Sequence, residues 1–184
     1  FYEGGGKVAA SYPGSPTVEI LESMKEYEEI YSEFSTNEKV ALEVAMGASL
    51  YGSRAMASMN HVGMNIAADP LMTFTQTPIN GGFVLVSGSD PGMASSQNEQ
   101  DNRIFGKFAN MGILAPGSSQ EAKDFMKFAL DISEEFEAPI LIDISSRTCH
   151  SRGIVELDDR VEKEPSGFEI DQEKYCMLPP NTYK

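Results

Sequence analysis

The residues with the clearest chemical potential lie in Ser35-Thr-Asn-Glu-Lys-Val-Ala-Leu-Glu-Val-Ala-Met-Gly47, which places Glu38 in the first turn of an expected helix. Ser35-x-x-Glu38 has the spacing of a capping box, in which the two side chains satisfy each other's backbone N–H groups. The same carboxylate could instead hold and activate an organic cofactor. Spacing alone favours the cap, because Ser96-x-x-Glu99 and Ser118-x-x-Glu121 repeat the pattern.

Small residues recur at helical spacing after Glu38, at Ala41, Ala45 and Ala48. Such a stripe permits another backbone or helix to approach closely. A partner there would desolvate the carboxylate and strengthen its hydrogen bonds, as a catalytic acid requires.

A second candidate is the turn Tyr12-Pro-Gly-Ser-Pro16. Ser15 followed by Pro16 predicts a helix start, with a hydroxyl at the N-cap and proline at the first helical position. The hydroxyl and the N–H groups of a first turn could also bind a carboxylate or phosphate. Capping is favoured on the sequence alone.

Two further side chains stand where a ligand could meet them. His61 follows an expected strand and precedes a glycine turn, which suits acid–base work or a substrate contact as well as a purely structural role. Arg103 lies one helical turn after Glu99 and could pair with it, or could anchor a substrate carboxylate. His150 and Arg152 are interpreted as structural.

Short apolar runs alternate with longer helical stretches, which predicts an α/β fold with a mostly parallel six-stranded sheet covered on both faces, a three-layer αβα sandwich. In such sheets ligands meet the loops at the carboxyl ends of the strands, where all of these candidates fall. The expected strands are Lys7–Ser11, Glu29–Phe34, Ala55–Met59, Phe83–Ser87, Ile113–Ala115 and Ile140–Ser145. The expected helices are 16–26, 37–52, 65–77, 96–109 and 119–136.

The overall composition excludes several classes of protein. The net charge of −14, from 28 acids and 14 bases, argues against nucleic acid and anionic membrane as partners. The sequence contains no run of about 18 apolar residues, so it predicts no membrane span. The two cysteines, Cys149 and Cys176, form no ligand spacing with the two histidines, so we expect no metal site from this chain and a reduced, cytoplasmic protein. The absence of an initiator Met suggests a fragment of a longer protein.

After residue 153 the alternation decays into a charged, proline-interrupted stretch. We therefore expect residues 1–153 to form the domain and residues 154–184 to form an extended arm or interdomain linker.

Taken together, the loops resemble one family in order along nearly the whole chain. The segments that carry the resemblance are Val8–Ile20, Ser35–Gly47, Met59–Met72, Asp90–Arg103, His150–Gly153 and Lys174–Pro179. They are similar to the N-terminal domain of the indolepyruvate:ferredoxin oxidoreductase alpha subunit, a 2-oxoacid:ferredoxin oxidoreductase. The block Asp90-Pro-Gly-Met-Ala-Ser-Ser-Gln-Asn-Glu-Gln-Asp-Asn-Arg103 is the most specific of these motifs.

The resemblance implies a thiamine diphosphate-binding fold of the pyrimidine-binding type and an oxidative decarboxylation of indolepyruvate or another arylpyruvate to an acyl-CoA. Glu38 would then hydrogen-bond the ring nitrogen N1′ of the cofactor's aminopyrimidine and be the catalytic residue. Pro13 and Ser15 would line the cofactor site. Ser15, His61 and Arg103 would face the 2-oxo acid substrate.

The resemblance also implies parts that this sequence lacks. No Gly-Asp-Gly segment for Mg²⁺ and diphosphate and no cysteine cluster for [4Fe-4S] centres occurs here. The diphosphate-binding domain of the same or a second subunit would supply the former, and the face formed by Ala41, Ala45 and Ala48 would be part of the contact with that domain. A beta subunit, ferredoxin and coenzyme A would complete the reaction. Two alternatives remain open: a non-catalytic assembly domain, or the same enzyme class acting on pyruvate or branched 2-oxo acids.

Overall fold

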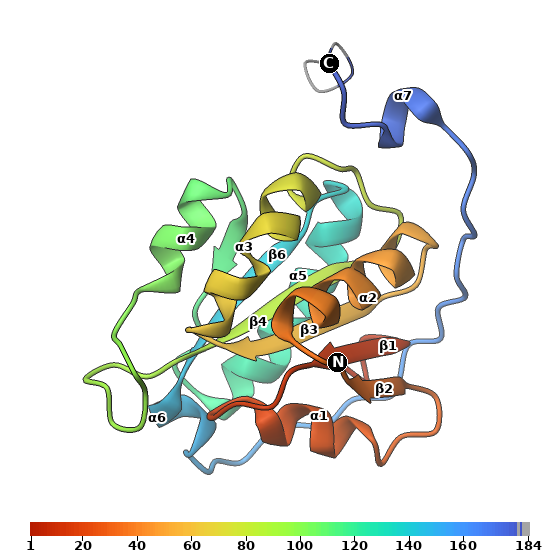
Figure 1. Cartoon of the computed structure of the whole chain (residues 1–184). Coiled ribbons are helices and arrows are strands. Elements are labelled where there is room, and N and C mark those ends of the chain that lie inside the picture. Colours follow the sequence, from red (N-terminus) through yellow and green to blue (C-terminus); the bar gives the residue numbers. More distant parts are fainter. Residues whose placement is uncertain (180, 182–184) are drawn as a thin grey trace.

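The computed structural model describes residues 1–179 and 181, and it is built on one six-stranded sheet (Figure 1). All strand pairs are parallel, in the order β2-β1-β3-β4-β6-β5. The predicted parallel α/β sheet is therefore confirmed. The strands are β1 Val8–Ser11, β2 Tyr31–Phe34, β3 Ala55–Asn60, β4 Phe83–Ser89, β5 Gly112–Leu114 and β6 Ile140–Ser145.

Five helices join successive strands, and two short ones follow the last strand. The helices are α1 Val18–Met24, α2 Glu38–Leu50, α3 Gly63–Phe74, α4 Asn102–Phe108, α5 Ser119–Glu135, α6 Ser146–Cys149 and α7 Gln172–Tyr175. Within the described residues no helix is long and apolar enough to span a membrane.

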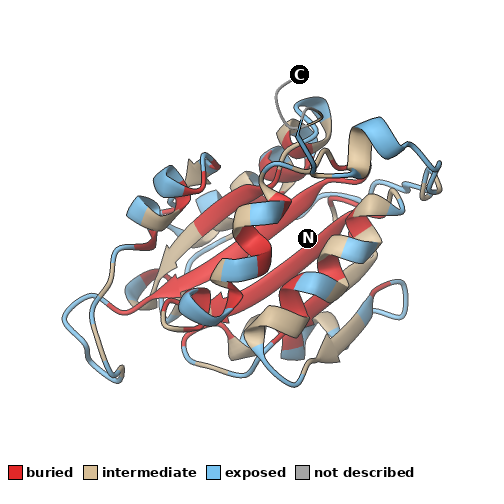
Figure 2. Cartoon of the chain, turned by 45° about the horizontal axis from the view of Figure 1, so that its top comes forward, coloured by how far each residue is buried: buried red, intermediate tan, exposed pale blue. Residues whose placement is uncertain are grey.

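The helices cover both faces of the sheet, so the molecule has the three predicted layers. Helices α2, α3 and α4 contribute to a core on one face, whereas α1 and α5 contribute to a second core on the other. Residues of one strand alternate between the two cores: Phe83 and Leu85 face the first, Val84 and Val86 the second. Figure 2 shows the result, with buried central strands between helices whose outer sides are exposed.

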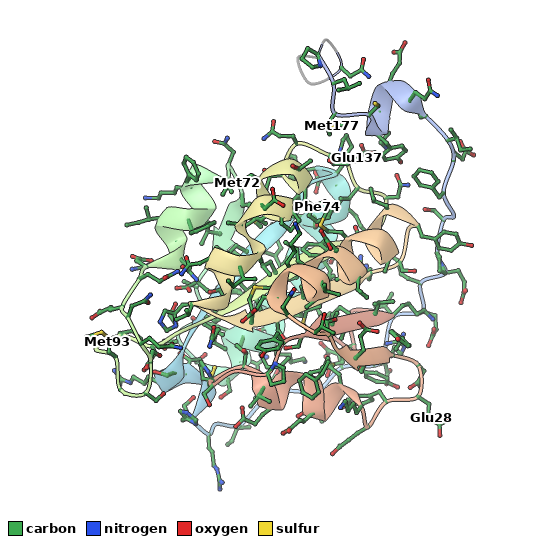
Figure 3. The ribbon with its side chains drawn as sticks, viewed as in Figure 1. Glu28, Met72, Phe74, Met93, Glu137 and Met177 are labelled. Atoms are coloured by element: carbon green, nitrogen blue, oxygen red, sulfur yellow. The ribbon has the colours of Figure 1, made fainter. Side chains whose placement is uncertain are left out.

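Two aromatic side chains pack against each other in the core that α2, α3 and α4 form with the sheet. Phe74, the last residue of α3, is labelled in Figure 3. Its ring meets that of Phe83, at the start of β4, edge-on with 4.8 Å between ring centroids. Both side chains are fully buried. This contact fixes α3 against the sheet and thereby fixes the turn that precedes it.

The small residues of α2 do not form an exposed contact face. Ala41 and Ala45 are fully buried, in the core between α2 and the sheet, and Ala48 packs against that core. The expectation that this stripe meets another domain is wrong for Ala41 and Ala45. Small side chains let α2 sit close to the sheet and to α3.

Four of the expected helix starts differ from those in the structure. Helix α3 begins at Gly63, two residues before the expected start. Asn37, not Ser35, is the N-cap of α2, and its Oδ1 accepts a hydrogen bond from the Val40 N–H at 2.9 Å. Helix α1 begins at Val18 after Thr17, so Ser15 is not a cap. Helix α4 begins at Asn102 after Asp101, which leaves 96–101 as loop.

For Ser35 and Ser96 the physical reason is that each hydroxyl donates to a nearby carboxylate instead of capping a helix. Ser35 Oγ donates to Glu33 at 2.8 Å, and Ser96 Oγ donates to Asp90 at 2.7 Å. Of the three capping-box patterns only Ser118 is a cap, with its Oγ accepting from the Glu121 N–H at 3.2 Å. Sequence spacing alone could not show with which of several nearby donors and acceptors each hydroxyl would form a hydrogen bond.

The chain after α6 runs along the outside of the domain (Figure 1). Described residues between 150 and 171 form no helix or strand, and α7 adds one helical turn beyond them. Arg160 fastens this segment by donating to the carbonyl oxygens of Tyr2 at 2.7 Å and Gly6 at 3.0 Å. Residues 180 and 182–184 of the predicted arm lie outside the described residues.

Candidate active site

The sheet topology brings two of the predicted residues, Ser15 and Glu38, to the same edge of the sheet as Asn60. After β1 the chain adds β2 on one side and β3 on the other, so the loops that follow β1 and β3 diverge and leave a crevice at the carboxyl edge. Ser15 follows β1, Glu38 follows β2, and Asn60 ends β3. A β-carbon on Gly14 would lie 2.8 Å from Asn60 Nδ2, which shows how closely these turns meet.

Glu38 is the first residue of α2 and is half-buried. Its side chain packs on the α-carbon of Gly63, because a β-carbon there would lie 2.6 Å from Glu38 Cγ and 2.7 Å from Oε1. Asn60 Oδ1 in turn accepts the Gly63 N–H at 2.7 Å. Within the described part of the chain the Glu38 carboxylate has no hydrogen-bond or ion-pair partner, so it is available to a ligand.

Ser15 lies in a polar cavity of about 510 Å³ beside these turns. Its other lining residues are Asn60, Ser95, Ser96 and Gln97, all of which carry hydroxyls or amides. Ser15 and Pro13 are both exposed. The serine hydroxyl, freed from the predicted capping role, therefore faces a space that a ligand could enter.

His61 is placed differently from the expectation. The side chain is fully buried, and its Nδ1 and Nε2 lie 3.2 Å and 3.0 Å from the carbonyl oxygens of Gly88 and Asn98. It lines neither the Ser15 cavity nor the Arg103 cavity. With both nitrogens engaged by backbone, the ring has no free edge for a direct substrate contact.

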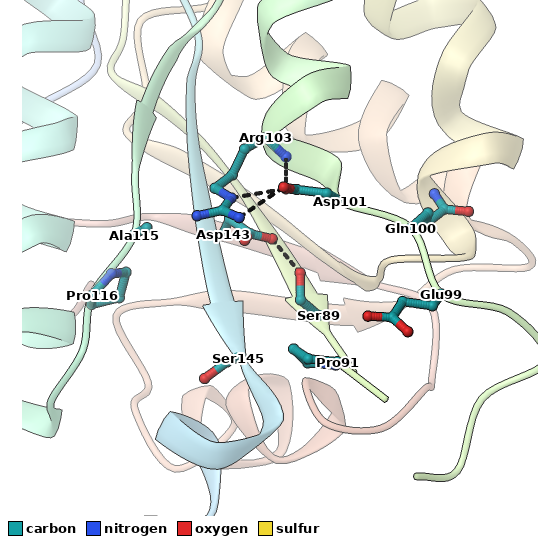
Figure 4. Close-up of a pocket in the computed structure, with 10 residues that line it drawn as sticks. All are labelled: Ser89, Pro91, Glu99, Gln100, Asp101, Arg103, Ala115, Pro116, Asp143 and Ser145. Carbon is teal, nitrogen blue, oxygen red and sulfur yellow. Dashed lines mark hydrogen bonds and ion pairs between the residues drawn. The ribbon is translucent and has the colours of Figure 1, made fainter. Parts of the chain in front are cut away.

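Arg103 lines a separate cavity of about 350 Å³ toward β5 and β6 (Figure 4). Its guanidinium donates to both carboxylate oxygens of Asp101, at 2.8 Å and 2.7 Å, and not to Glu99 as the spacing suggested. The hydrogen bond from Arg103 lowers the pKa of Asp101. Glu99 lines the same cavity.

Two further acids shape the electrostatics of this edge. Asp143 on β6 accepts a 2.5 Å hydrogen bond from Ser89, yet burial dominates and raises the pKa of Asp143. Asp90 is buried at the end of β4, and hydrogen bonds from the Ser95 N–H and the Ser96 hydroxyl lower its pKa. The Asp90 carboxylate, in its ionised form, therefore holds Ser95 and Ser96 at the start of the loop.

Sequence reasoning missed Asn60, Gly63 and Asp143 as parts of the site. Asn60 and Gly63 stand on either side of His61 and follow a strand, so their position after β3 was a usable signal. For Asp143 no local signal existed, because it lies within a strand. Among the described residues no group of three or more His, Cys, Asp or Glu side chains could hold a metal ion.

The residues present fit the aminopyrimidine side of thiamine diphosphate. An available carboxylate stands in a first helical turn, and Gly63 leaves the space that the Glu38 side chain occupies. The neighbouring cavity offers the Ser15 hydroxyl and the Asn60 amide. An aromatic ring with a basic nitrogen needs a hydrogen-bonding acid, which Glu38 can supply.

Comparison with known proteins agrees with this geometry. The chain is 47% identical over 191 residues to the indolepyruvate oxidoreductase subunit IorA of Archaeoglobus fulgidus, covering 99% of this chain and 31% of that protein. It is 44% identical over 186 residues to the protein of the same name in Pyrococcus horikoshii, covering 96% and 29%. The chain thus spans about a third of the length of these relatives.

A solved structure shares the fold. A 2-oxoglutarate:ferredoxin oxidoreductase from Magnetococcus marinus, with 2-oxoglutarate, coenzyme A and succinyl-CoA bound, superposes with a TM-score of 0.66 at 15% identity, covering 97% of this chain and 36% of that one. A family model matches residues 1–182. The chain therefore belongs to the family described as pyruvate flavodoxin/ferredoxin oxidoreductase, thiamine diphosphate-binding.

Proposed function

We propose that this chain is the pyrimidine-binding half of the active site of a ferredoxin-dependent 2-oxoacid oxidoreductase that acts on indolepyruvate or a related arylpyruvate. The observation that carries the proposal is the available Glu38 carboxylate, which starts α2 and packs against Gly63. Family membership supplies the cofactor class. The names of the relatives at 47% and 44% identity support the substrate class.

Glu38 would hold a hydrogen bond to N1′ of the bound aminopyrimidine and move a proton at that atom. The start of α2 suits this role, since the Asn37 cap fixes the first turn and so aims the carboxylate. Thiamine diphosphate, when bound, supplies a nucleophilic carbon that adds to the keto group and accepts the electrons left by departing carbon dioxide. Pro13 and Ser15 would line the site next to the ring.

Ser15 and Arg103 are the proposed contacts of the 2-oxo acid. Ser15 offers a hydroxyl from an exposed turn, and Arg103 offers a fork of N–H donors that matches a carboxylate. Asp101 occupies that fork in the structure, so a substrate carboxylate would have to displace it or bind the remaining donors. The exposed position of this ion pair keeps its net stability small and such an exchange easy.

The rest of the machinery would come from outside this chain, which spans 31% of its Archaeoglobus relative. We propose that a diphosphate-binding domain supplies the Mg²⁺ ligands and that other regions bind the [4Fe-4S] clusters. A beta subunit, ferredoxin and coenzyme A would be the further partners, in the cytoplasm. The net charge of −14 supports the absence of nucleic acid and membrane partners.

Glu38→Gln in the complete enzyme tests the proposal. We expect thiamine diphosphate to bind nearly as before and turnover to fall by about 100-fold or more, since the amide cannot exchange the proton. Glu43→Gln, on the exposed side of the same helix, is the matched control. Near-normal turnover of Glu38→Gln would overturn the assignment.

Assays with three substrates address the substrate class. The complete enzyme should turn over indolepyruvate and phenylpyruvate with a higher kcat/KM than pyruvate. A preference for pyruvate or a branched 2-oxo acid would keep the enzyme class and refute the aryl specificity. Absence of turnover with every 2-oxo acid, in an enzyme that binds its cofactor, would favour an assembly role.

A further inference from the structure

His61 connects the end of β4 to the loop that follows it. Its ring nitrogens lie 3.2 Å and 3.0 Å from the carbonyl oxygens of Gly88 and Asn98, and its side chain is fully buried. A neutral imidazole carries one N–H group, so one of these two contacts is a hydrogen bond and the tautomer decides which. Both partner atoms are backbone carbonyl oxygens, so a side-chain substitution in the loop would not remove them.

The loop residue held by the ring stands between two cavities. Ser95, Ser96 and Gln97 line the cavity of Ser15, whereas Glu99, Gln100 and Asp101 line that of Arg103. Asn98 lies between the two sets in the sequence. A contact that fixes the backbone of Asn98 therefore helps to position the loop residues that line both cavities.

The backbone of His61 fastens the same loop a second time. Its carbonyl oxygen accepts hydrogen bonds from Gln100 Nε2 at 2.8 Å and from Asn102 Nδ2 at 3.1 Å. Asn102 also donates to Ser87 at 2.7 Å, so the start of α4 is tied to β4. Ring and carbonyl together attach the loop to the carboxyl ends of β3 and β4.

The remaining anchor of the loop acts at its other end. Asp90 accepts from the Ser95 N–H at 2.9 Å and from the Ser96 hydroxyl at 2.7 Å. These bonds fix the first part of the loop, but they do not reach the residues that line the Arg103 cavity. From Asn98 onward the loop is held by the His61 ring, by the amides that bond to the His61 carbonyl, and by Asn65, whose side chain exchanges hydrogen bonds with Gln100 at 2.9 Å and 3.1 Å.

We propose that His61 is a positioning residue that holds loop 95–101 as the common wall of the Ser15 and Arg103 cavities. The ring acts through the backbone of Asn98 and does not touch the substrate. This inference rests on the proposed function, because it assigns the loop to the 2-oxo acid site. It replaces the expectation that His61 contacts the substrate directly.

The test compares His61→Phe and His61→Gln in the complete enzyme. Phenylalanine keeps a ring of similar size without any donor, whereas glutamine keeps one donor for a carbonyl. For His61→Phe we expect the KM for indolepyruvate to rise about tenfold, a loss that matches one hydrogen bond, with cofactor binding unchanged. His61→Gln should lie between this variant and the wild type. His150→Phe, which changes the exposed histidine, is the control and should change nothing.

Hydrogen exchange measured by mass spectrometry locates the effect. Peptides covering residues 94–104 should take up deuterium faster in His61→Phe, while peptides from β1, β3 and α2 keep wild-type protection. This arm needs no turnover, so it tests the positioning role even if the enzyme proves inactive with 2-oxo acids. Unchanged exchange at 94–104 with an unchanged KM would overturn the proposal. Faster exchange throughout the sheet, or failure of both variants to fold, would overturn it equally, because His61 would then support the whole fold.

Discussion

The side chain of Glu38 lies against the α-carbon of Gly63, so that a β-carbon on Gly63 would stand 2.6 Å from Glu38 Cγ. The two residues begin neighbouring helices, α2 and α3, on the same face of the sheet. Position 63 therefore needs glycine because the Glu38 side chain occupies the space of a β-carbon, and not because of the backbone conformation of Gly63. Glycine at position 63 therefore leaves room for the position that the carboxylate takes in the structure, and a larger residue would move it.

Gly63→Ala should disturb catalysis more than stability. The new methyl group displaces Glu38, whose flexible side chain can swing away at little energetic cost, while alanine itself favours the helix. We expect turnover of the complete enzyme to fall by about tenfold to 100-fold, with the free energy of unfolding changed by less than about 1 kcal/mol.

Gly47→Ala is the matched control for this variant. Gly47 lies within α2, and a β-carbon there would meet nothing within 4 Å. This change should raise the free energy of unfolding by about 0.5–1 kcal/mol without affecting turnover. Equal turnover in the two variants would show that the Glu38–Gly63 contact has no part in catalysis.

Asn37→Ala should destabilise the protein by about 1 kcal/mol, because it removes the side chain that caps α2. Ser35→Ala should cost much less, since the Ser35 hydroxyl bonds to Glu33 and not to the helix. Chemical denaturation of the two variants compares them directly. A larger loss in Ser35→Ala would reinstate the capping box that the sequence suggested.

Ala45→Leu should destabilise the protein by about 1–3 kcal/mol, because Ala45 is fully buried between α2 and the sheet and its surroundings have no room for a larger side chain. Glu43→Leu, on the exposed side of the same helix, should change stability by less than about 0.5 kcal/mol. Thermal unfolding distinguishes the two. Tolerance of leucine at position 45 would mean that this face is free for a partner after all.

Glu134 should make stability depend on acid pH. Its burial opposes ionisation, but hydrogen bonds from Arg54 and Lys163 outweigh burial and lower the pKa of Glu134 to about 2. Because this pKa lies below the ordinary value, the stabilisation is fully present above about pH 4.5 and is lost as the pH falls toward 2. Arg54 is buried and also donates to Asp131, so the network fixes the start of β3 to α5.

Unfolding measured between pH 7 and pH 3 tests this dependence. Glu134→Gln should lower the free energy of unfolding by about 2 kcal/mol at pH 7 and flatten its decline toward acid pH. Glu135→Gln, the exposed neighbour, should leave the pH curve unchanged. Parallel curves for the wild type and Glu134→Gln would contradict the assigned cause.

Much of the fold was predictable because the signals are local. A buried parallel strand is rich in apolar residues, and Ile140–Ser145, with four aliphatic residues among its six, was predicted with its exact ends. The start of α4 was wrong by six residues, because Ser96 and Glu99 repeat a capping pattern that Asp101 in fact fulfils. Several polar side chains near a helix end could cap it. Which of them does so depends on the other hydrogen-bond partners nearby, and these come from distant parts of the chain.

The sequence by itself determined the α/β class, the parallel sheet and the position of Glu38 at the start of a helix after a strand. It also determined the family, through loops that match in order. Only the tertiary structure decided that Gly63 flanks Glu38, that His61 is buried between two carbonyl groups, and that Arg103 faces Asp101. The physical reason is that strand and helix formation depend on the periodicity of neighbouring residues, whereas contacts at the carboxyl edge depend on the order in which the strands are laid side by side.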